Sequence, residues 1–326
     1  MTKRKDGPRP VVIGTCALSG RGVKSADVRL ADGLAMIDKM AHEAERQGWG
    51  LDIVALPEHF ALVDGSAPQD SAERLDGRTV SAMAEKARAY GTYAVASLYL
   101  AEGGAFYNSA VLLDRRGEPI GVYHKVFPVV MPDGTVEQGI TPGSQFPVWD
   151  LDIGRVGMQV CFDAAYEDGW QALAAQEAEL VVFPSAAPCI AAIISYASRF
   201  GYYVAGAIYR PPGFIVDPLG AVIARADADR EVAVARVDLD YRIVPSRFLW
   251  TRGDELKRKY GDRVDYGWHD AEGSCVMTST DPGLPVGRFI EAESIETMPD
   301  WLARNRQAQD KARGRRLTMP RKVKGR

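Results

Sequence analysis

Two spacings of apolar residues alternate along the first 240 positions of the chain. Short apolar runs that stop at Pro or Gly predict strands, and spacings of three and four predict helices with one apolar face. The clearest helical pattern, between residues 27 and 47, consists of Leu30, Leu34, Ile37, Met40 and Ala44. The other predicted helices cover 72–90, 170–178 and 191–200, and the strands cover 10–15, 51–56, 93–99, 109–113, 119–123, 155–160, 180–183, 202–208, 213–216, 221–224 and 232–237.

The order of these elements predicts the fold class. Strands and helices alternate at the start of the chain, which is typical of helices packed over sheets. A turn sequence at 114–117 and the strand-rich stretch after residue 202 indicate hairpins, so the sheets are not purely parallel. Residues 127–147 are rich in Pro, Gly and polar side chains, and a loop of that length inside a domain is often functional. We therefore expect a layered α/β domain with mixed sheets.

The pattern changes after residue 247. Residues 251–275 are polar, and a predicted helix at 298–311 has only Trp301 and Leu302 as strong apolar anchors. From Trp301 onward the chain has ten Lys or Arg and one acid, Asp310. Such a tail can contact nucleic acid, but no aromatic residues or binding motif accompany it, which favours a solvated, partly disordered terminus or an arm on a neighbouring subunit. We divide the chain into 9–247 and an extension, 248–326, too polar for a core of its own.

Composition indicates a globular protein but does not identify its function. The 326 residues are 46% hydrophobic and 25% charged, enough for a sizeable core, and the net charge of −3 indicates no particular partner. No apolar stretch is long enough for a membrane span, and no apolar region follows the basic N-terminus as in a signal peptide. Scattered Cys and His give no disulfide or metal spacing, so we expect a cytoplasmic protein with no metal and no cofactor.

Reactive side chains close three apolar segments. Glu58 follows Leu56-Pro57, Lys125 follows Tyr123-His124, and Cys161 ends the run from Arg155 to Val160. A thiol at a strand end, next to the start of a helix, favours the thiolate. A thiol, a carboxylate and an ammonium can together form a nucleophile, its base and a charge stabiliser. Cys161 alone is equally consistent with a buried structural thiol.

The order Glu, Lys, Cys, with separations of 67 and 36 residues, resembles the nitrilase superfamily of carbon–nitrogen hydrolases over roughly residues 9–247. Three further segments resemble the family: Thr141-Pro142-Gly143, Phe183-Pro184-Ser185-Ala186 and Val216-Asp217-Pro218-Leu219-Gly220. The resemblance implies a four-layer α-β-β-α sandwich with mixed sheets. It also implies a homo-oligomer, a dimer or larger, and a cysteine hydrolase that needs no metal or cofactor.

The resemblance assigns a role to each reactive residue. Cys161 would attack an amide or nitrile carbon, and Glu58 would act as general base and then acid. Lys125 would stabilise the oxyanion with the backbone N–H of Phe162. Glu137, in the loop after the lysine, would hold Lys125 or orient substrate.

The residues after the cysteine depart from the family pattern. Ala165, Glu167 and Asp168 replace the Arg, Pro and Glu of many amidase-like members, and the Trp-Glu of nitrile-specific members is absent. This favours an amide or N-carbamoyl substrate over a nitrile. Acyl transfer to an amine, or a non-catalytic protein that kept the fold, stays open. Phe127, Tyr166 and Trp170 are candidate pocket walls, with simple packing as the alternative. Arg199 is a candidate for binding a substrate carboxylate, with a structural or interface role as the alternative.

Overall fold

The computed structural model describes residues 7–18, 22, 25–269 and 273–318. The chain forms two compact units, Arg9–Leu239 and Asp240–Arg326. The first unit contains two six-stranded sheets. The first sheet has the order β12 (Val232–Asp238), β1 (Pro10–Cys16), β2 (Ile53–Ala55), β3 (Tyr93–Glu102), β4 (Ala105–Leu113) and β5 (Pro119–His124). The second has the order β11 (Val222–Ala226), β10 (Gly213–Val216), β9 (Tyr203–Ile208), β8 (Leu180–Ser185), β7 (Gly154–Met158) and β6 (Val148–Leu151).

Both sheets have a parallel centre between antiparallel edges. In the first sheet β1, β2 and β3 are parallel, and in the second β7, β8 and β9 are parallel. β4 is antiparallel to β3, and β5 is antiparallel to β4, so β5 runs in the same direction as β2. The carboxyl ends of β2 and β5 therefore lie at one edge of the first sheet, which is where open α/β sheets place ligands.

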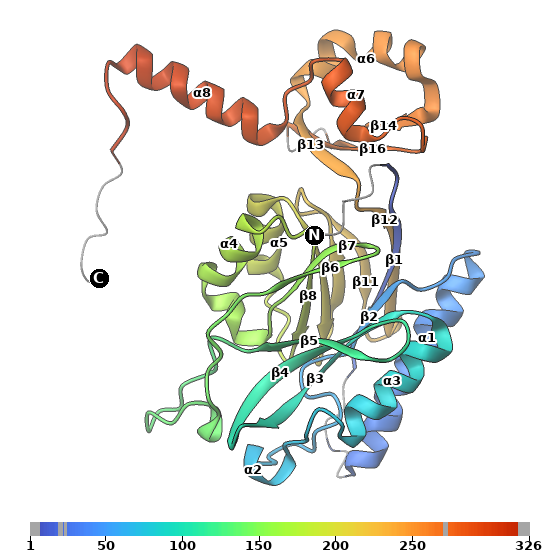
Figure 1. The fold of residues 1–326 in the computed structure, drawn as a ribbon, viewed down its shortest axis with the longest axis vertical. Coiled ribbons are helices and arrows are strands. Elements are labelled where there is room, and N and C mark those ends of the chain that lie inside the picture. Colours follow the sequence, from blue (N-terminus) through green and yellow to red (C-terminus); the bar gives the residue numbers. More distant parts are fainter. Residues whose placement is uncertain (1–6, 19–21, 23–24, 270–272, 319–326) are drawn as a thin grey trace. The chain divides into compact units, whose positions relative to one another are not determined.

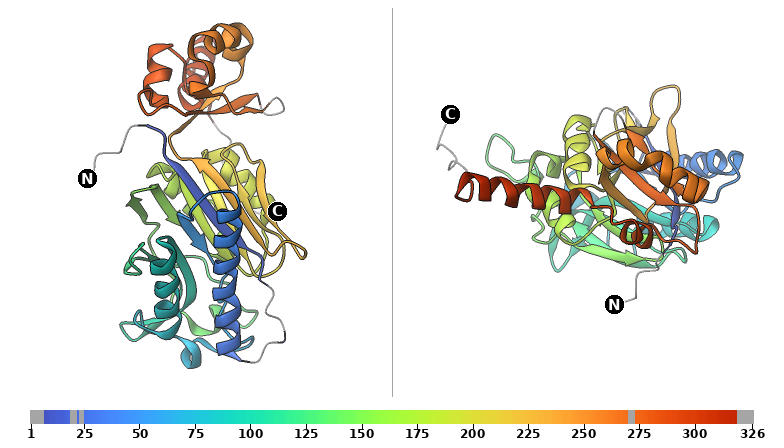
Figure 2. Two further views of the ribbon diagram at one scale, coloured as in Figure 1. Left: turned by 90° about the vertical axis from the view of Figure 1, so that its right-hand side faces the viewer. Right: turned by 90° about the horizontal axis from the view of Figure 1, so that it is seen from above.

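Helices cover the outer faces of the two sheets (Figures 1 and 2). α1 (Ala26–Arg46) and α3 (Arg78–Tyr90) pack on the first sheet, and α4 (Glu167–Ala175) and α5 (Ile190–Phe200) pack on the second. Between the sheets, strands β1, β2, β9 and β10 face one another. The predicted four-layer α-β-β-α sandwich is confirmed.

The first long helix forms as its apolar spacing predicts. Ser25 caps α1 by accepting a hydrogen bond from the Val28 N–H, and Asp27 lies in the first turn. Ile37 and Met40 are fully buried against the first sheet. Burial of side chains of this size stabilises the fold by about 1.5–3 kcal/mol each, so α1 is held by its apolar face.

The predicted helix over 72–90 is wrong in its first third. The structure has a short helix, α2 (Pro68–Ser71), and then α3, with Glu73 extended between them. The Glu73 N–H donates to Tyr99 O at 2.9 Å, and Glu73 O accepts from Ala101 N at 2.8 Å. The Glu73 carboxylate caps α3 by accepting from the Thr79 N–H at 2.7 Å. Pairing with β3 satisfies the backbone of Glu73 in a way that helical spacing alone does not reveal.

The second unit contains a small sheet and three helices. β16 (Ser274–Ser279) pairs with β13 (Tyr241–Pro245), β14 (Val264–Asp265) and β15 (Trp268–His269), and the helices are α6 (Arg247–Tyr260), α7 (Val286–Ala292) and α8 (Met298–Arg313). Buried apolar side chains, among them Leu256, Met277 and Phe289, form a core. The expectation that this region has no core of its own is therefore wrong. Its apolar residues lie far apart in sequence and meet only when β13 and β16 pair.

The last helix carries a second correction. Thr297 caps the start of α8, where its side chain accepts a hydrogen bond from the Asp300 N–H, but no residue of α8 is buried. Leu302 is 53% exposed, so it does not anchor the helix as predicted. The end of the basic tail, 319–326, lies outside the described residues. Within the part of the chain that the structure describes, no helix has the length and apolar character of a membrane span.

Candidate active site

Glu58 lies just beyond the carboxyl end of β2, where Leu56 and Pro57 end the strand. Its side chain is only 4% exposed. One carboxylate oxygen, Oε2, accepts a hydrogen bond from the Ala186 N–H at 3.1 Å. Ala186 directly follows β8 of the second sheet, so this bond brings the strand ends of both sheets together around Glu58.

Lys125 follows β5 and reaches the same place. Its Nζ lies 3.0 Å from Glu58 Oε1 and 2.9 Å from Glu137 Oε2. Glu137 belongs to the long loop after Lys125, and the loop returns to β5 through a close contact at Gly143. A Cβ on Gly143 would lie 2.1 Å from the His124 carbonyl oxygen, so only glycine fits there. The Thr141-Pro142-Gly143 turn thereby closes the loop that carries Glu137.

The three charges stabilise one another inside the protein. Burial would raise the pKa of Glu58, but the Lys125 ammonium, together with His59 and a hydrogen bond from Cys161, holds that pKa below its usual value. Burial would also raise the pKa of Glu137, but His59 and Lys125 lower it to about 2. Burial would lower the pKa of Lys125, yet Glu58 raises it far above its usual value. At neutral pH both carboxylates are ionised and the lysine is charged.

Cys161 begins a short 3-10 helix (Cys161–Ala165) after β7. Its backbone has φ of 46°, a left-handed conformation that costs a non-glycine residue energy and is found at functional sites. The Asp163 carboxylate holds this turn. It accepts from the Val160 N–H at 2.8 Å, the Phe127 N–H at 2.9 Å and the Tyr123 hydroxyl at 2.8 Å.

The thiol is protonated at rest, so the expectation of a thiolate is wrong. Burial raises the pKa of Cys161 to about 12, and the charge of Glu58 acts in the same direction. Lys125 and a hydrogen bond with Ser185 oppose this rise without cancelling it. The ionised Glu58 carboxylate lies beside the thiol and can take its proton as the sulfur attacks a carbon. The arrangement suits a nucleophile that is activated by an adjacent base.

This protonation state predicts how Cys161 reacts with a small uncharged thiol reagent. Because the thiolate reacts and the pKa is about 12, the labelling rate should rise about tenfold per pH unit between pH 7 and pH 9. Mass spectrometry of the modified peptide measures that rate, and a Cys161→Ala variant identifies the signal. A rate that levels off near neutral pH would contradict the buried thiol.

The structure separates the predicted pocket residues into two groups. Phe127 and Tyr166 stack with ring centroids 4.1 Å apart, and Phe162 meets Tyr166 edge-on at 6.0 Å. Phe127 also donates its N–H to Asp163, so this aromatic group borders the Cys161 turn.

The prediction that Trp170 and Arg199 line the pocket is wrong. Trp170 is fully buried in the core beneath α4, where its indole N–H donates to Asp163 O at 3.1 Å. The Arg199 side chain is 61% exposed and pairs with Glu167 at 2.8 Å. On their helices Trp170 faces inward and Arg199 faces outward.

Sequence reasoning missed Asn108. Its Nδ2 donates to Glu58 Oε1 at 2.8 Å and to Glu137 Oε1 at 2.5 Å. In the sequence Asn108 is only a polar residue next to an apolar run. The predicted strand began at residue 109, so Asn108 fell just outside it. His59 directly follows Glu58 in the sequence. Its Nε2 lies 4.0 Å from Glu58 Oε1 and 3.9 Å from Glu137 Oε1, and its ring packs on Tyr99 at 4.1 Å.

Glu58, His59 and Glu137 have ligand atoms within 4.8 Å of one another, which is close enough to hold a cation. The Lys125 ammonium, however, already contacts both carboxylates. A metal ion there would have to displace a buried positive charge, so this donor set does not fit a metal.

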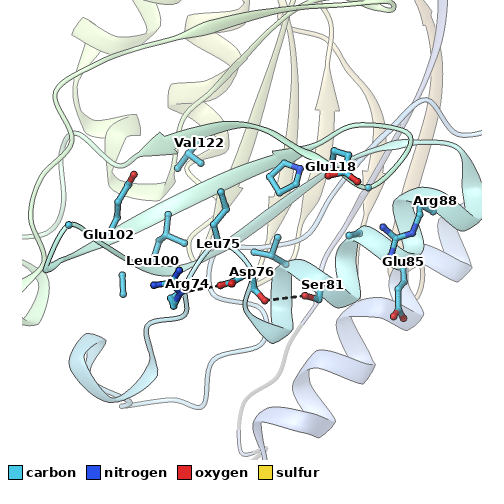
Figure 3. Close-up of a pocket in the computed structure, with 16 residues that line it drawn as sticks. Arg74, Leu75, Asp76, Ser81, Glu85, Arg88, Leu100, Glu102, Glu118 and Val122 are labelled. Atoms are coloured by element: carbon cyan, nitrogen blue, oxygen red, sulfur yellow. Dashed lines mark hydrogen bonds and ion pairs between the residues drawn. The ribbon is translucent and has the colours of Figure 1, made fainter.

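A separate cavity of about 620 Å³ lies between α3 and the strands β3 and β5 (Figure 3). Leu75, Leu100 and Val122 give it apolar walls, and charged side chains such as Arg74 and Glu102 surround them. Glu58, Lys125 and Cys161 are not among its lining residues. This cavity is therefore distinct from the candidate active site.

Comparison with known proteins adds to this geometry. The family model described as carbon-nitrogen hydrolase matches residues 21–243, more than half of the chain, and includes Glu58, Lys125 and Cys161. The chain belongs to the carbon–nitrogen hydrolase family. The resemblance inferred from the motifs is thus confirmed, and this carbon–nitrogen hydrolase acts on bonds other than peptide bonds.

Individual relatives of the hydrolase are distant. It is 26% identical over 236 residues to an omega-amidase of Xenopus laevis, covering 65% of this chain and 84% of that protein. It is 29% identical over 166 residues to a citrullinase of Francisella tularensis, covering 48% of this chain but only 56% of that protein. An amidase of Nesterenkonia sp., solved with butyramide, is 25% identical with a TM-score of 0.59, covering 78% of this chain and 98% of that chain.

Proposed function

We propose that this protein hydrolyses a small linear amide or an N-carbamoyl compound through a thioester on Cys161. One observation carries the proposal: the Lys125 ammonium lies between the carboxylates of Glu58 and Glu137, with the Cys161 thiol beside Glu58. The site therefore offers a nucleophile, a base that is ionised at neutral pH, and a fixed positive charge.

The first half of the reaction forms the thioester. The Cys161 sulfur attacks the carbonyl carbon while its proton passes to Glu58. The carbonyl oxygen becomes an oxyanion that Lys125 stabilises, together with the Phe162 N–H. Glu58 then protonates the leaving nitrogen, the C–N bond breaks, and ammonia or an amine departs.

The second half uses the same groups in reverse. Glu58 takes a proton from water, and the hydroxide attacks the thioester carbon. The C–S bond breaks, the sulfur recovers its proton from Glu58, and the acid is released. Glu137 keeps Lys125 in place through both halves because it shares the ammonium with Glu58.

The substrate class follows from the site and from the relatives. Citrulline carries a ureido group and omega-amidases act on side-chain amides, so the names of two relatives indicate amide and carbamoyl carbons. Butyramide, bound in the Nesterenkonia amidase, is a small linear amide. The stacked rings of Phe127 and Tyr166 border the Cys161 turn and are suited to the apolar part of such a molecule.

A substrate panel tests this proposal. Ammonia release is measured with linear amides, ureido acids and nitriles of equal chain length. Turnover of amides or ureido acids supports the proposal, whereas acid formed only from nitriles would identify a nitrilase. Product that depends on added amine would indicate acyl transfer. No turnover in any arm, with no adduct on Cys161, would favour a non-catalytic protein that kept the fold.

Assembly and location follow as further proposals. We propose a homo-oligomer, at least a dimer, as the resemblance to the family implies. Light scattering at micromolar concentration measures this, and a monomer would contradict it. The four cysteines are free thiols, which is consistent with a reducing compartment such as the cytoplasm.

A further inference from the structure

Asn108 contacts all three charged members of the site. It lies within β4, is 1% exposed, and donates one Nδ2 hydrogen to Glu58 at 2.8 Å and the other to Glu137 at 2.5 Å. Its backbone oxygen accepts from the Lys125 N–H at 2.8 Å. A single residue thus links the base, the lysine and the second carboxylate.

We infer that Asn108 is a positioning residue that keeps Glu58 ionised and aimed at Cys161 by donating hydrogen bonds to both carboxylates. This inference rests on the proposed function. Two carboxylates beside one ammonium repel each other, and Lys125 can neutralise only one of the two charges. A neutral amide nitrogen supplies two donors without adding charge, and donation to an ionised carboxylate favours its charged form.

The other groups around the carboxylates cannot replace these two bonds. Lys125 is shared between Glu58 and Glu137. His59 helps to lower the pKa of both carboxylates, but its Nε2 lies 4.0 Å from Glu58 Oε1 and 3.9 Å from Glu137 Oε1, beyond hydrogen-bond distance of both. The Tyr99 ring lies against His59, and burial and both carboxylates raise the pKa of Tyr99, so its phenol stays neutral. The Cys161 thiol also donates a hydrogen bond to Glu58, but its proton is the one transferred during the attack, so it does not hold the carboxylate through the reaction.

The test replaces Asn108 with Leu, which keeps the volume and removes both donors. Glu58 must be ionised to accept the thiol proton, so kcat/KM falls as the pH falls through the pKa of Glu58. Without the two bonds that pKa rises, and the acidic limb of the profile should move up by about one pH unit. We expect a loss of about 100-fold, carried by kcat and not by KM.

A matched control is the neighbouring Ser109→Ala. Ser109 is fully buried on the same strand, but its hydroxyl bonds to His124 Nδ1 at 2.8 Å, away from the carboxylates. This variant should keep the wild-type acidic limb. Equal losses in both variants with no shift of the limb would overturn the inference, since they would show a general effect of altering β4. Asn108→Ala also removes both donors without adding a charge, and it replaces Leu if that variant does not fold.

A measurement without substrate separates this inference from the proposed function. Carbon-13 NMR of the glutamate carboxyls follows the titration of Glu58 directly, and Glu58→Gln assigns its signal. An upward shift in Asn108→Leu supports the positioning role even if no tested amide is hydrolysed. An unchanged titration would overturn the role even if activity is lost.

Discussion

Replacement of Cys161 by Ala is expected to abolish hydrolysis, with a loss of about 10⁴-fold or more in kcat. The thiol is the only group placed to form a bond to carbon beside the ionised Glu58, and within the described residues no other cysteine has that neighbour as a hydrogen-bond partner. Ammonia release from the substrate identified in the panel measures the loss.

Cys189→Ala is the matched control. Cys189 also has a left-handed backbone, with φ of 46°, and its pKa is raised by burial and by the charge of Glu58. It precedes α5, however, and makes no hydrogen bond to the base. We expect near wild-type activity in that variant. A Cys161→Ala enzyme that still turns over would remove the thioester from the mechanism.

The thioester itself can be trapped. In a Glu58→Gln variant the activation of water is lost, so any acyl group that forms on Cys161 should persist. Intact-protein mass spectrometry then shows the mass of the acyl group, and peptide mapping places it on Cys161. An adduct on Cys189 instead would contradict the assignment.

Replacement of Lys125 by Met is the second large effect, because it changes both activity and stability. Lys125 is 2% exposed and balances two buried carboxylates. Removing one partner of a buried charge cluster costs about 3–5 kcal/mol in the free energy of unfolding. Activity should fall by about 10³-fold, because the oxyanion loses its positive charge. Urea unfolding and kcat are measured on the same preparation.

The loss of stability in Lys125→Met should depend on pH, and its direction follows from the pKa values of the two carboxylates. Without Lys125 the buried carboxylates repel, so their pKa values in the folded state rise above the unfolded values. Such groups destabilise the fold increasingly as the pH rises, so the stability difference from wild type should grow between pH 4 and pH 7. Lys125→Met combined with Glu137→Gln should recover part of the stability and none of the activity. A Lys125→Met protein that unfolds like wild type at pH 7 would show that the cluster contributes nothing to stability.

Local sequence patterns predicted most of the elements of the first unit because those elements are held by nearby contacts. The helix at 27–47 has the apolar face that α1 buries, and the strands that end at Pro57 and after Tyr123 are present as β2 and β5. The error at Glu73 has the opposite cause. Its backbone pairs with Tyr99 and Ala101, about 26 residues away in the sequence, and no local pattern reports that pairing.

The sequence by itself predicted the family and the layered sandwich, and it named Glu58, Lys125 and Cys161 as the candidate site, because motif order and apolar spacing can be read without coordinates. The tertiary structure alone decided how these groups behave. Burial makes Cys161 a thiol at rest, and strand β4 places Asn108 against both carboxylates. Trp170 is buried in the core, and Arg199 is exposed and pairs with Glu167. The physical reason is that pKa values and hydrogen bonds depend on neighbours that the fold supplies, and such neighbours come from distant parts of the chain.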